Sequence, residues 1–180
     1  MNRRTVDYRQ LHAEEDDVAD LVIGWLKEHP NPLTRHRSAY SWNWGWGHRV
    51  LGWIVSQPTC DRATAIHIFW AALPHEVVAP EYAEEFVRDK GSVYYLLRLI
   101  AELEANGRFP DENLETQWSE QWQAAYERFD ELLASGQIDE SWQVARQLKP
   151  RRPIFEWVSH PFFPEGIPQP ILDQISDGRR

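Results

Sequence analysis

The chain has 180 residues, 42% of them apolar, which suits one domain with a single sizeable core. Its 19 basic and 28 acidic residues give a formal net charge of −9 at pH 7, so phosphate backbones would repel it. The sequence has no run of about 18 apolar residues that could cross a bilayer. We therefore expect no nucleic-acid partner and no membrane association.

The single cysteine, Cys60, excludes an intrachain disulfide and any metal site made of several cysteines. The N-terminus continues into acidic sequence rather than an apolar signal region, so we expect a cytoplasmic protein. Residues 31–75 hold four arginines and one acid, whereas residues 76–150 hold seven basic and sixteen acidic side chains. The sequence thus has a basic centre followed by an acidic second half.

Hydrophobic spacing predicts helices in almost every segment of the chain. Apolar residues three or four positions apart in 18–26, preceded by acids at 14–17, predict a first helix. A second short helix is expected over 33–42 and a third over 50–55, with a glycine-containing turn between them.

The best-defined helix begins after Asp61, whose carboxylate is placed to accept the backbone N–H of Thr64. Loss of this cap should cost about 0.5–2 kcal/mol of stability rather than any activity. Pro74 is expected to close this helix. Residues 48–73 would then form two short antiparallel helices, the helical hairpin of many all-α folds.

Further helical signals cover 81–88, 93–105, 113–134 and 138–148. Six prolines in 149–180 predict an extended tail with a turn near 171–175. The tail aromatics that should pack onto the domain are Phe155, Trp157, Phe162 and Phe163. We predict an all-α fold: a single domain of about seven to eight helices packed as antiparallel hairpins (1–148), with an extended Pro-rich tail (149–180).

Residues 41–48, with the sequence SWNWGWGH and here called the Trp loop, place three tryptophans next to turn-forming glycines. Such rings form either a core corner or a recognition surface. We interpret them as mainly structural rings that fix the loop against neighbouring helices. The loop's candidate partner contacts are Trp42, Trp46 and His48.

Cys60 is a candidate nucleophile, because a helix N-terminus lowers the pKa of a thiol. The adjacent carboxylate of Asp61 opposes this effect, and no histidine has a spacing that identifies it as the base. The four histidines of 36–75 also lack metal-ligand spacing. We expect no catalytic residue, no metal and no cofactor, and a buried or half-buried cysteine at the helix start.

Two segments, Asn43-Trp44-Gly45-Trp46-Gly47 and Cys60-Asp61-Arg62-Ala63-Thr64-Ala65-Ile66-His67-Ile68-Phe69-Trp70, carry a resemblance. They resemble a bacterial family of unknown function with the pattern Asn-Trp-Asp-x-Gly and then Cys-Asp-x-x-Thr-Ala-(Leu/Ile)-x-Ile-Phe-Trp. Gly45 stands in place of the usual aspartate, so no role of that carboxylate carries over. The resemblance implies a helical core over 33–108 and an association with toxin-immunity loci. The residues it marks as structural are Asn43, Trp44, Gly47, Cys60, Asp61, Thr64, Phe69 and Trp70.

Acidic residues recur through the second half of the chain, which is typical of a solvated helix face or of a surface that attracts a basic partner. The candidate partner-binding acids are Glu112, Glu115, Glu120, Glu127, Asp130 and Glu131, with Asp139 and Glu140 beside them.

Our leading hypothesis is a non-catalytic helical protein-binding module, of the immunity type that neutralises a basic toxin domain. Two alternatives stay open. One is a small-ligand-binding protein or enzyme that uses the Trp loop with Cys60 and Asp61. The other is an oligomeric scaffold, since the sequence leaves the oligomeric state open.

Overall fold

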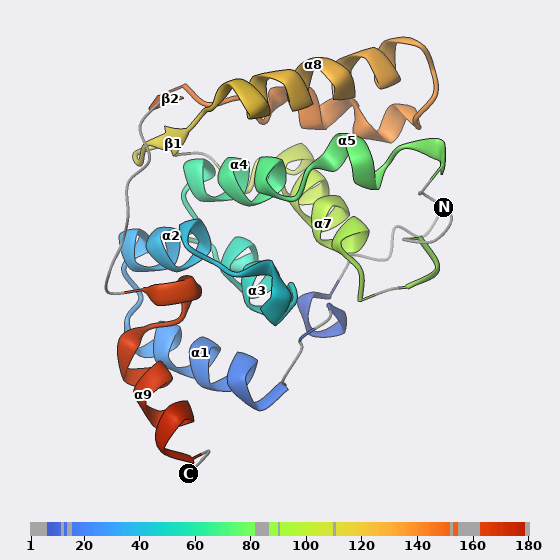
Figure 1. The fold of residues 1–180 in the computed structure, drawn as a ribbon. Helices are drawn as coiled ribbons and strands as arrows, with labels where there is room; N and C mark the ends of the chain where they lie inside the picture. Colours follow the sequence, from blue (N-terminus) through green and yellow to red (C-terminus); the bar gives the residue numbers. More distant parts are fainter. Residues whose placement is uncertain are drawn as a thin grey trace.

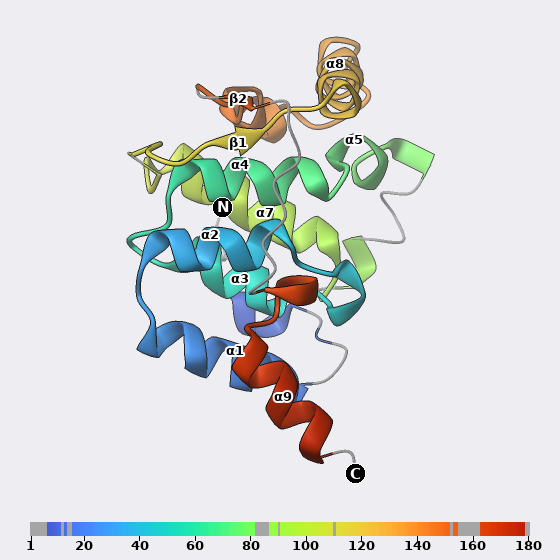
Figure 2. The same cartoon turned by 60° about the vertical axis from the view of Figure 1, so that its left-hand side comes forward.

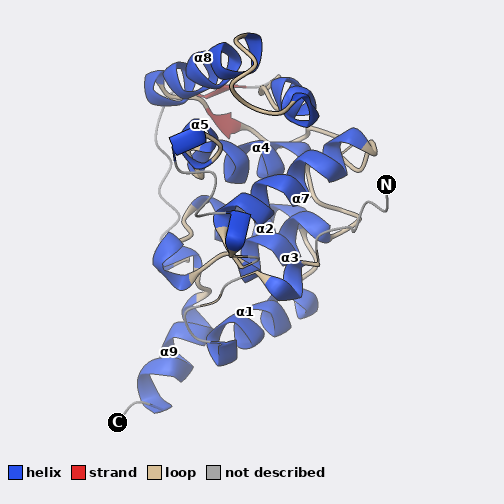
Figure 3. Ribbon diagram, turned by 90° about the vertical axis from the view of Figure 1, so that its right-hand side faces the viewer, coloured by secondary structure: helices blue, strands red, loops and turns tan. Residues whose placement is uncertain are grey.

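The computed structural model describes residues 7–11, 13, 16–81, 87–89, 91–109, 111–151, 153–154 and 163–178. Most of the helix expected over 81–88 and three of the tail aromatics, Phe155, Trp157 and Phe162, lie outside these residues. Helices make up most of the described fold (Figure 3), which confirms the all-α prediction.

The first helices follow the sequence signals closely. They are α1 (Asp16–Glu28), α2 (Pro32–Tyr40) and α3 (Arg49–Ser56). The side chain of Asn31 caps α2 by accepting the backbone N–H of Leu33 at 2.9 Å, and Pro32 occupies the first turn, where no N–H is needed. A short 3-10 helix, η1 (Tyr8–Gln10), precedes α1, and another, η2 (Trp44–Trp46), lies between α2 and α3.

The helix α4 (Arg62–Ala71) begins at the predicted cap and ends before Pro74, as expected. Leu73 adopts a left-handed conformation with φ 50°, and Pro74 then starts a short new helix, α5 (Pro74–Val77). A proline in the first turn of a helix loses no hydrogen bond, so Pro74 can follow the end of α4 and also begin α5. The neighbours of α4 include α2 as well as α3.

The second half begins with α7 (Val93–Ala105) and continues into a short strand rather than directly into a helix. β1 (Thr116–Gln117) pairs in parallel with β2 (Pro153–Ile154), with Thr116 opposite Pro153. The predicted 113–134 helix therefore starts later, as α8 (Glu120–Ala134), with Ser119 accepting the backbone N–H of Trp122 at 3.2 Å. A 3-10 helix, η3 (Glu140–Gln147), stands where 138–148 was expected to be helical.

The helices stack in order from one end of the molecule to the other (Figures 1 and 2). α1 and α9 (Gln169–Gly178) form one end, α2 and α3 follow, α4, α5 and α7 come next, and α8 with η3 forms the opposite end. The core runs through the stack, with Phe69, Trp70 and Phe129 fully buried. In the described residues, no helix is both long and apolar enough to cross a membrane.

The tail packs onto the Trp loop through η4 (Pro164–Gly166). The backbone N–H of Asn43 donates to the Glu165 carbonyl at 3.0 Å, and the Ser38 hydroxyl donates to the Gly166 carbonyl at 2.5 Å. Phe163 and Ile171 are buried. The turn expected near 171–175 is instead part of the ten-residue helix α9, because its apolar residues pack against α1.

Gly166 allows this close contact, and its replacement should destabilise the fold. Its φ is +79°, and an added Cβ would lie 2.5 Å from both the Ser38 carbonyl oxygen and the Trp42 Cα. We expect Gly166→Ala to lower the free energy of unfolding by more than about 1 kcal/mol, measured by urea denaturation.

The matched control is Gly24→Ala in the middle of α1, where no atom lies within 4 Å of an added Cβ. This substitution should stabilise the fold by about 0.5–1 kcal/mol. If the two substitutions changed the free energy of unfolding equally, the close packing of the tail at Gly166 would be contradicted.

Candidate functional site

The start of α4 gathers most of the chemically distinctive side chains. Asp61 is buried and uses both carboxylate oxygens: Oδ1 accepts the backbone N–H of Ala63 at 2.9 Å, and Oδ2 accepts that of Asn113 at 2.8 Å. The predicted cap is confirmed, but its donor is Ala63, because Thr64 donates its N–H to the Asp61 carbonyl at 3.0 Å. One carboxylate therefore ties α4 to a segment 52 residues away.

Arg62 is the residue that sequence reasoning missed. Its guanidinium is only 5% exposed and forms ion pairs with Glu104 at 3.1 Å and Glu112 at 2.6 Å. It also donates to the Lys149 carbonyl at 3.3 Å and to the Gln147 carbonyl. The signal in the sequence for a buried ion pair was an arginine in a helix of mostly apolar residues, since a charge that is buried must be paired.

Glu112 was expected on the acidic surface, yet its side chain is 1% exposed. Besides the Arg62 ion pair, its Oε1 accepts the backbone N–H of Arg151 at 2.5 Å. Glu112 is therefore a buried counter-ion, and its carboxylate is not presented to a partner.

Cys60 is buried, and its thiol lies 3.5 Å from the Asp61 carbonyl oxygen, to which it donates weakly. Burial first, and then the charge of Asp61, raise the pKa of this thiol to about 12. The thiolate that a nucleophile needs is therefore scarce at neutral pH, and the expected buried cysteine fits this placement.

The Trp loop is held on several sides. Trp42 is buried, and its indole N–H donates to the Gly47 carbonyl at 2.9 Å. Asn43 accepts the backbone N–H of Gly45 at 2.9 Å, and Gly47, with φ 81°, pairs with Ala13 in an isolated bridge.

The other Trp-loop rings are half-buried. Trp46 donates its indole N–H to Glu165 at 2.9 Å, while the ring of His48 meets that of Trp44 edge-on at 5.7 Å. Of the three partner contacts expected in this loop, Trp42 lies inside the domain, while Trp46 and His48 keep partial exposure.

A ligand pocket joining the Trp loop to Cys60 and Asp61 is not supported by these contacts. Trp70 is fully buried among Trp118, Tyr126 and Phe129, and its indole N–H donates to the Leu148 carbonyl at 2.5 Å. The carboxylate of Asp61 is occupied by backbone N–H groups, and Trp46 is bonded to the tail. The residues of this alternative site thus serve different parts of the fold.

Two buried histidines meet between α2 and α4. Nδ1 of His36 lies 2.9 Å from the Thr64 hydroxyl, and the ring of His67 stacks on Tyr40 at 4.5 Å. Burial, and then the charge of His36, lower the pKa of His67 to about 3. Nowhere in the described residues do three or more His, Cys, Asp or Glu side chains converge as metal ligands.

The remaining predicted acids lie at the α8 end of the stack. Glu120, Glu127 and Glu131 share one face of α8 and are exposed, as are Glu115, Asp139 and Glu140. Asp130 is half-buried and pairs with Arg146 at 2.5 Å, while Glu131 pairs with Arg128 at 3.0 Å. We call these exposed carboxylates the acidic surface.

Two of the hollows in the described surface lie between helices. One, of about 380 Å³, lies between α7 and η3 and is lined by Arg98, Glu102, Asn106, Ser141 and Val144 among others. Arg98 fills part of it, since its guanidinium donates to the Ser141 hydroxyl at 2.6 Å and lies 5.0 Å from the Trp142 ring centroid. The other, of about 640 Å³, lies between α1 and α9.

The buried His67 predicts a pH dependence of stability. A folded pKa of about 3 lies below the ordinary value of 6.5, so between these values the unfolded chain binds more protons than the folded one. Stability should therefore fall as the pH falls through this window, by about 2 kcal/mol from pH 7 to pH 5 for this group.

The variant His67→Phe keeps a ring against Tyr40 and should lose this part of the slope, as measured by urea denaturation at several pH values. The matched control is His29→Phe, which also removes one imidazole but from an exposed position. A slope that is the same in wild type and His67→Phe would disprove the assignment to His67.

Comparison with known proteins identifies only the centre of the chain. Residues 30–102 match the model of a family described as Domain of unknown function (DUF4274), close to the 33–108 core that the sequence motifs implied. No curated protein and no solved structure matched the chain. The helices α2 to α7 thus carry the similarity to a domain-of-unknown-function family, whereas α1, α8, η3 and α9 lie outside the matched residues.

Proposed function

We propose that this chain is a non-catalytic helical protein-binding module that captures a basic partner protein on its acidic surface. The sequence resemblance suggests the partner class, a bacterial toxin domain. An immunity-type protein of this kind would neutralise the toxin by covering its active site or its substrate groove.

The acidic surface is the observation that carries the proposal. Glu120, Glu127 and Glu131 form an exposed row on α8, with Asp139 and Glu140 exposed at the start of η3. Only three basic residues, Arg128, Arg146 and Lys149, fall within 111–149. A surface of one dominant sign accelerates the encounter with a partner of opposite sign and disfavours partners of like sign.

The internal roles of the reactive side chains support a non-catalytic function. The Cys60 thiol stays protonated, Asp61 caps α4, and His67 is buried against Tyr40. General acid–base and nucleophilic catalysis both need groups that reach a substrate with a pKa near the working pH. Cys60 and His67 have neither property, and the carboxylate of Asp61 is occupied by two backbone N–H groups.

Salt and charge reversal test the acidic surface. The probe is the protein encoded by the gene next to the gene of this chain. An immunity function requires that this neighbouring protein is a secreted or multidomain toxin. We expect the association rate to fall about tenfold when NaCl is raised from about 0.05 to about 0.5 M. The double variant Glu120→Lys/Glu127→Lys should lower the rate at low salt, as measured by stopped-flow fluorescence.

The graded control is Glu120→Gln/Glu127→Gln, which keeps the side-chain size but changes the charge half as much. Its effect on the logarithm of the rate should be about half that of the lysine variant. Binding that ignores salt and both double variants would count against the acidic surface, and the absence of any toxin-like neighbour would count against immunity.

A further inference from the structure

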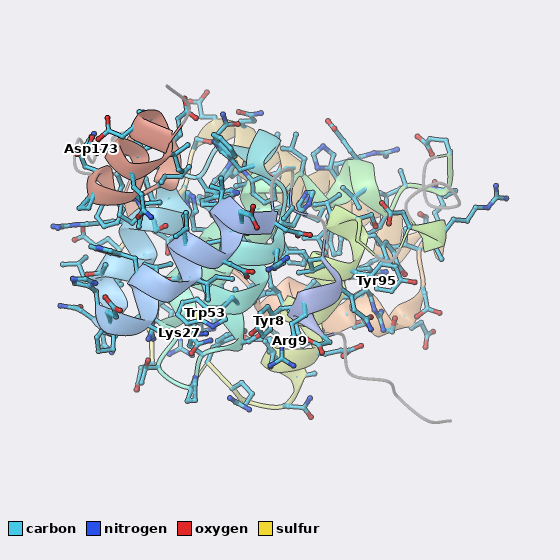
Figure 4. All side chains as sticks on the ribbon, turned by 90° about the horizontal axis from the view of Figure 1, so that it is seen from below. Tyr8, Arg9, Lys27, Trp53, Tyr95 and Asp173 are labelled. Carbon is cyan, nitrogen blue, oxygen red and sulfur yellow. The ribbon has the colours of Figure 1, made fainter. Side chains whose placement is uncertain are left out.

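The groove between α1 and α9 lies at the end of the stack opposite the acidic surface (Figure 1). Figure 4 looks onto this end, with α1 toward the viewer and Asp173 of α9 beside it. The groove has a volume of about 640 Å³. Its lining comes from Asp17, Asp20, Leu21, Gly24, Trp25, Glu28, Ile171 and Gln174.

The floor of the α1–α9 groove is apolar and rigid. Leu21 and Trp25 of α1 are half-buried, and Ile171 of α9 is 7% exposed. The Trp25 ring stacks on His29 at 3.8 Å and meets Phe163 edge-on at 6.1 Å. A half-exposed aromatic ring held on two sides is a good anchor, because a partner does not need to order it on binding.

The rim of the groove is acidic. Asp17, Asp20 and Glu28 line the groove and are exposed along α1. In the part of the chain that the structure describes, the charges that oppose them are Arg49, which pairs with Asp16 at 2.5 Å and also with Asp20, and the exposed Lys27. The acids still outnumber the bases, so the rim favours a cationic occupant.

Gly24 gives an independent reason to expect an occupant. It lies in the middle of α1, where glycine weakens a helix relative to alanine. Among the described residues, nothing lies within 4 Å of the position that a Cβ would take, so none of their contacts requires a glycine there. A glycine that lines a groove does, however, permit close approach of another backbone.

We propose that the α1–α9 groove docks an amphipathic helix of a partner protein whose polar face carries lysine or arginine. The apolar face of that helix lies on Leu21, Trp25 and Ile171, its closest approach is at Gly24, and its cations meet the acidic rim. A second copy of this chain is disfavoured, because its charge of −9 and its own acidic rim would repel the first. This surface is independent of the acidic surface on α8.

The probe for the groove is a fluorescent amphipathic peptide of about 15 residues made of leucine and lysine, with a leucine–glutamate peptide of equal length as its counterpart. We expect the lysine peptide, and not the glutamate peptide, to bind the full chain in a fluorescence anisotropy titration. Gly24→Leu, which fills the groove, should weaken binding by at least about tenfold. Its melting temperature should not fall, because leucine favours a helix more than glycine does and the added Cβ meets no described atom within 4 Å.

Ala124→Leu adds bulk to the exposed face of α8 and is the matched control, which should leave the peptide affinity unchanged. Glu28→Lys should weaken binding more than Glu120→Lys, although both variants have the same net charge. Absence of lysine-peptide binding, or equal effects of Gly24→Leu and Ala124→Leu, would overturn the proposal. So would self-association of the wild-type chain in sedimentation that Gly24→Leu abolishes. The α8 variants test the acidic surface separately.

Discussion

The buried guanidinium of Arg62 joins more of this fold than any other side chain in the described residues. From the first turn of α4 it pairs with Glu104 near the end of α7 and with Glu112 before β1, and it donates to two carbonyls at the end of η3. Burying a charge is costly unless every polar atom around it is satisfied. The segments that supply its acceptors are therefore held in one arrangement.

The α8 end of the molecule depends on this arrangement. Next to the Arg62 network, Asp61 accepts the backbone N–H of Asn113, and Trp70 donates to the Leu148 carbonyl. Trp70 also contacts the rings of Trp118 and Tyr126 edge-on or tilted. The matched family segment, 30–102, thus supplies the anchoring residues, and α8 and η3 are attached to it by polar contacts at one edge and aromatic packing at the other.

The residues that stabilise the fold are thus separate from the surfaces that we propose for binding. The motif residues Asp61, Phe69 and Trp70 point into the stack. The acidic surface and the α1–α9 groove lie at its two ends, on elements outside the matched segment.

The sequence predicts α1 to α4 well, because hydrophobic spacing and caps such as Asp61 are local signals. The sequence does not predict the conformation of segments that depend on contacts with residues far away along the chain. The 113–119 segment is not helical because Asn113 bonds to Asp61 and the Thr116 hydroxyl donates to the Ala63 carbonyl at 3.3 Å. Glu112 is buried because it pairs with Arg62. The two residues are 50 positions apart in the sequence, so no spacing rule reveals this pair.

A double-mutant cycle on Arg62 and Glu112, followed by the free energy of unfolding in urea, tests most directly whether the buried ion pair organises the fold. Arg62→Met and Glu112→Gln should each cost about 3–5 kcal/mol, since each leaves a buried polar group unmatched. The double variant should cost less than their sum by about 1–3 kcal/mol. Single losses below about 1 kcal/mol that add without coupling would contradict the central role of Arg62.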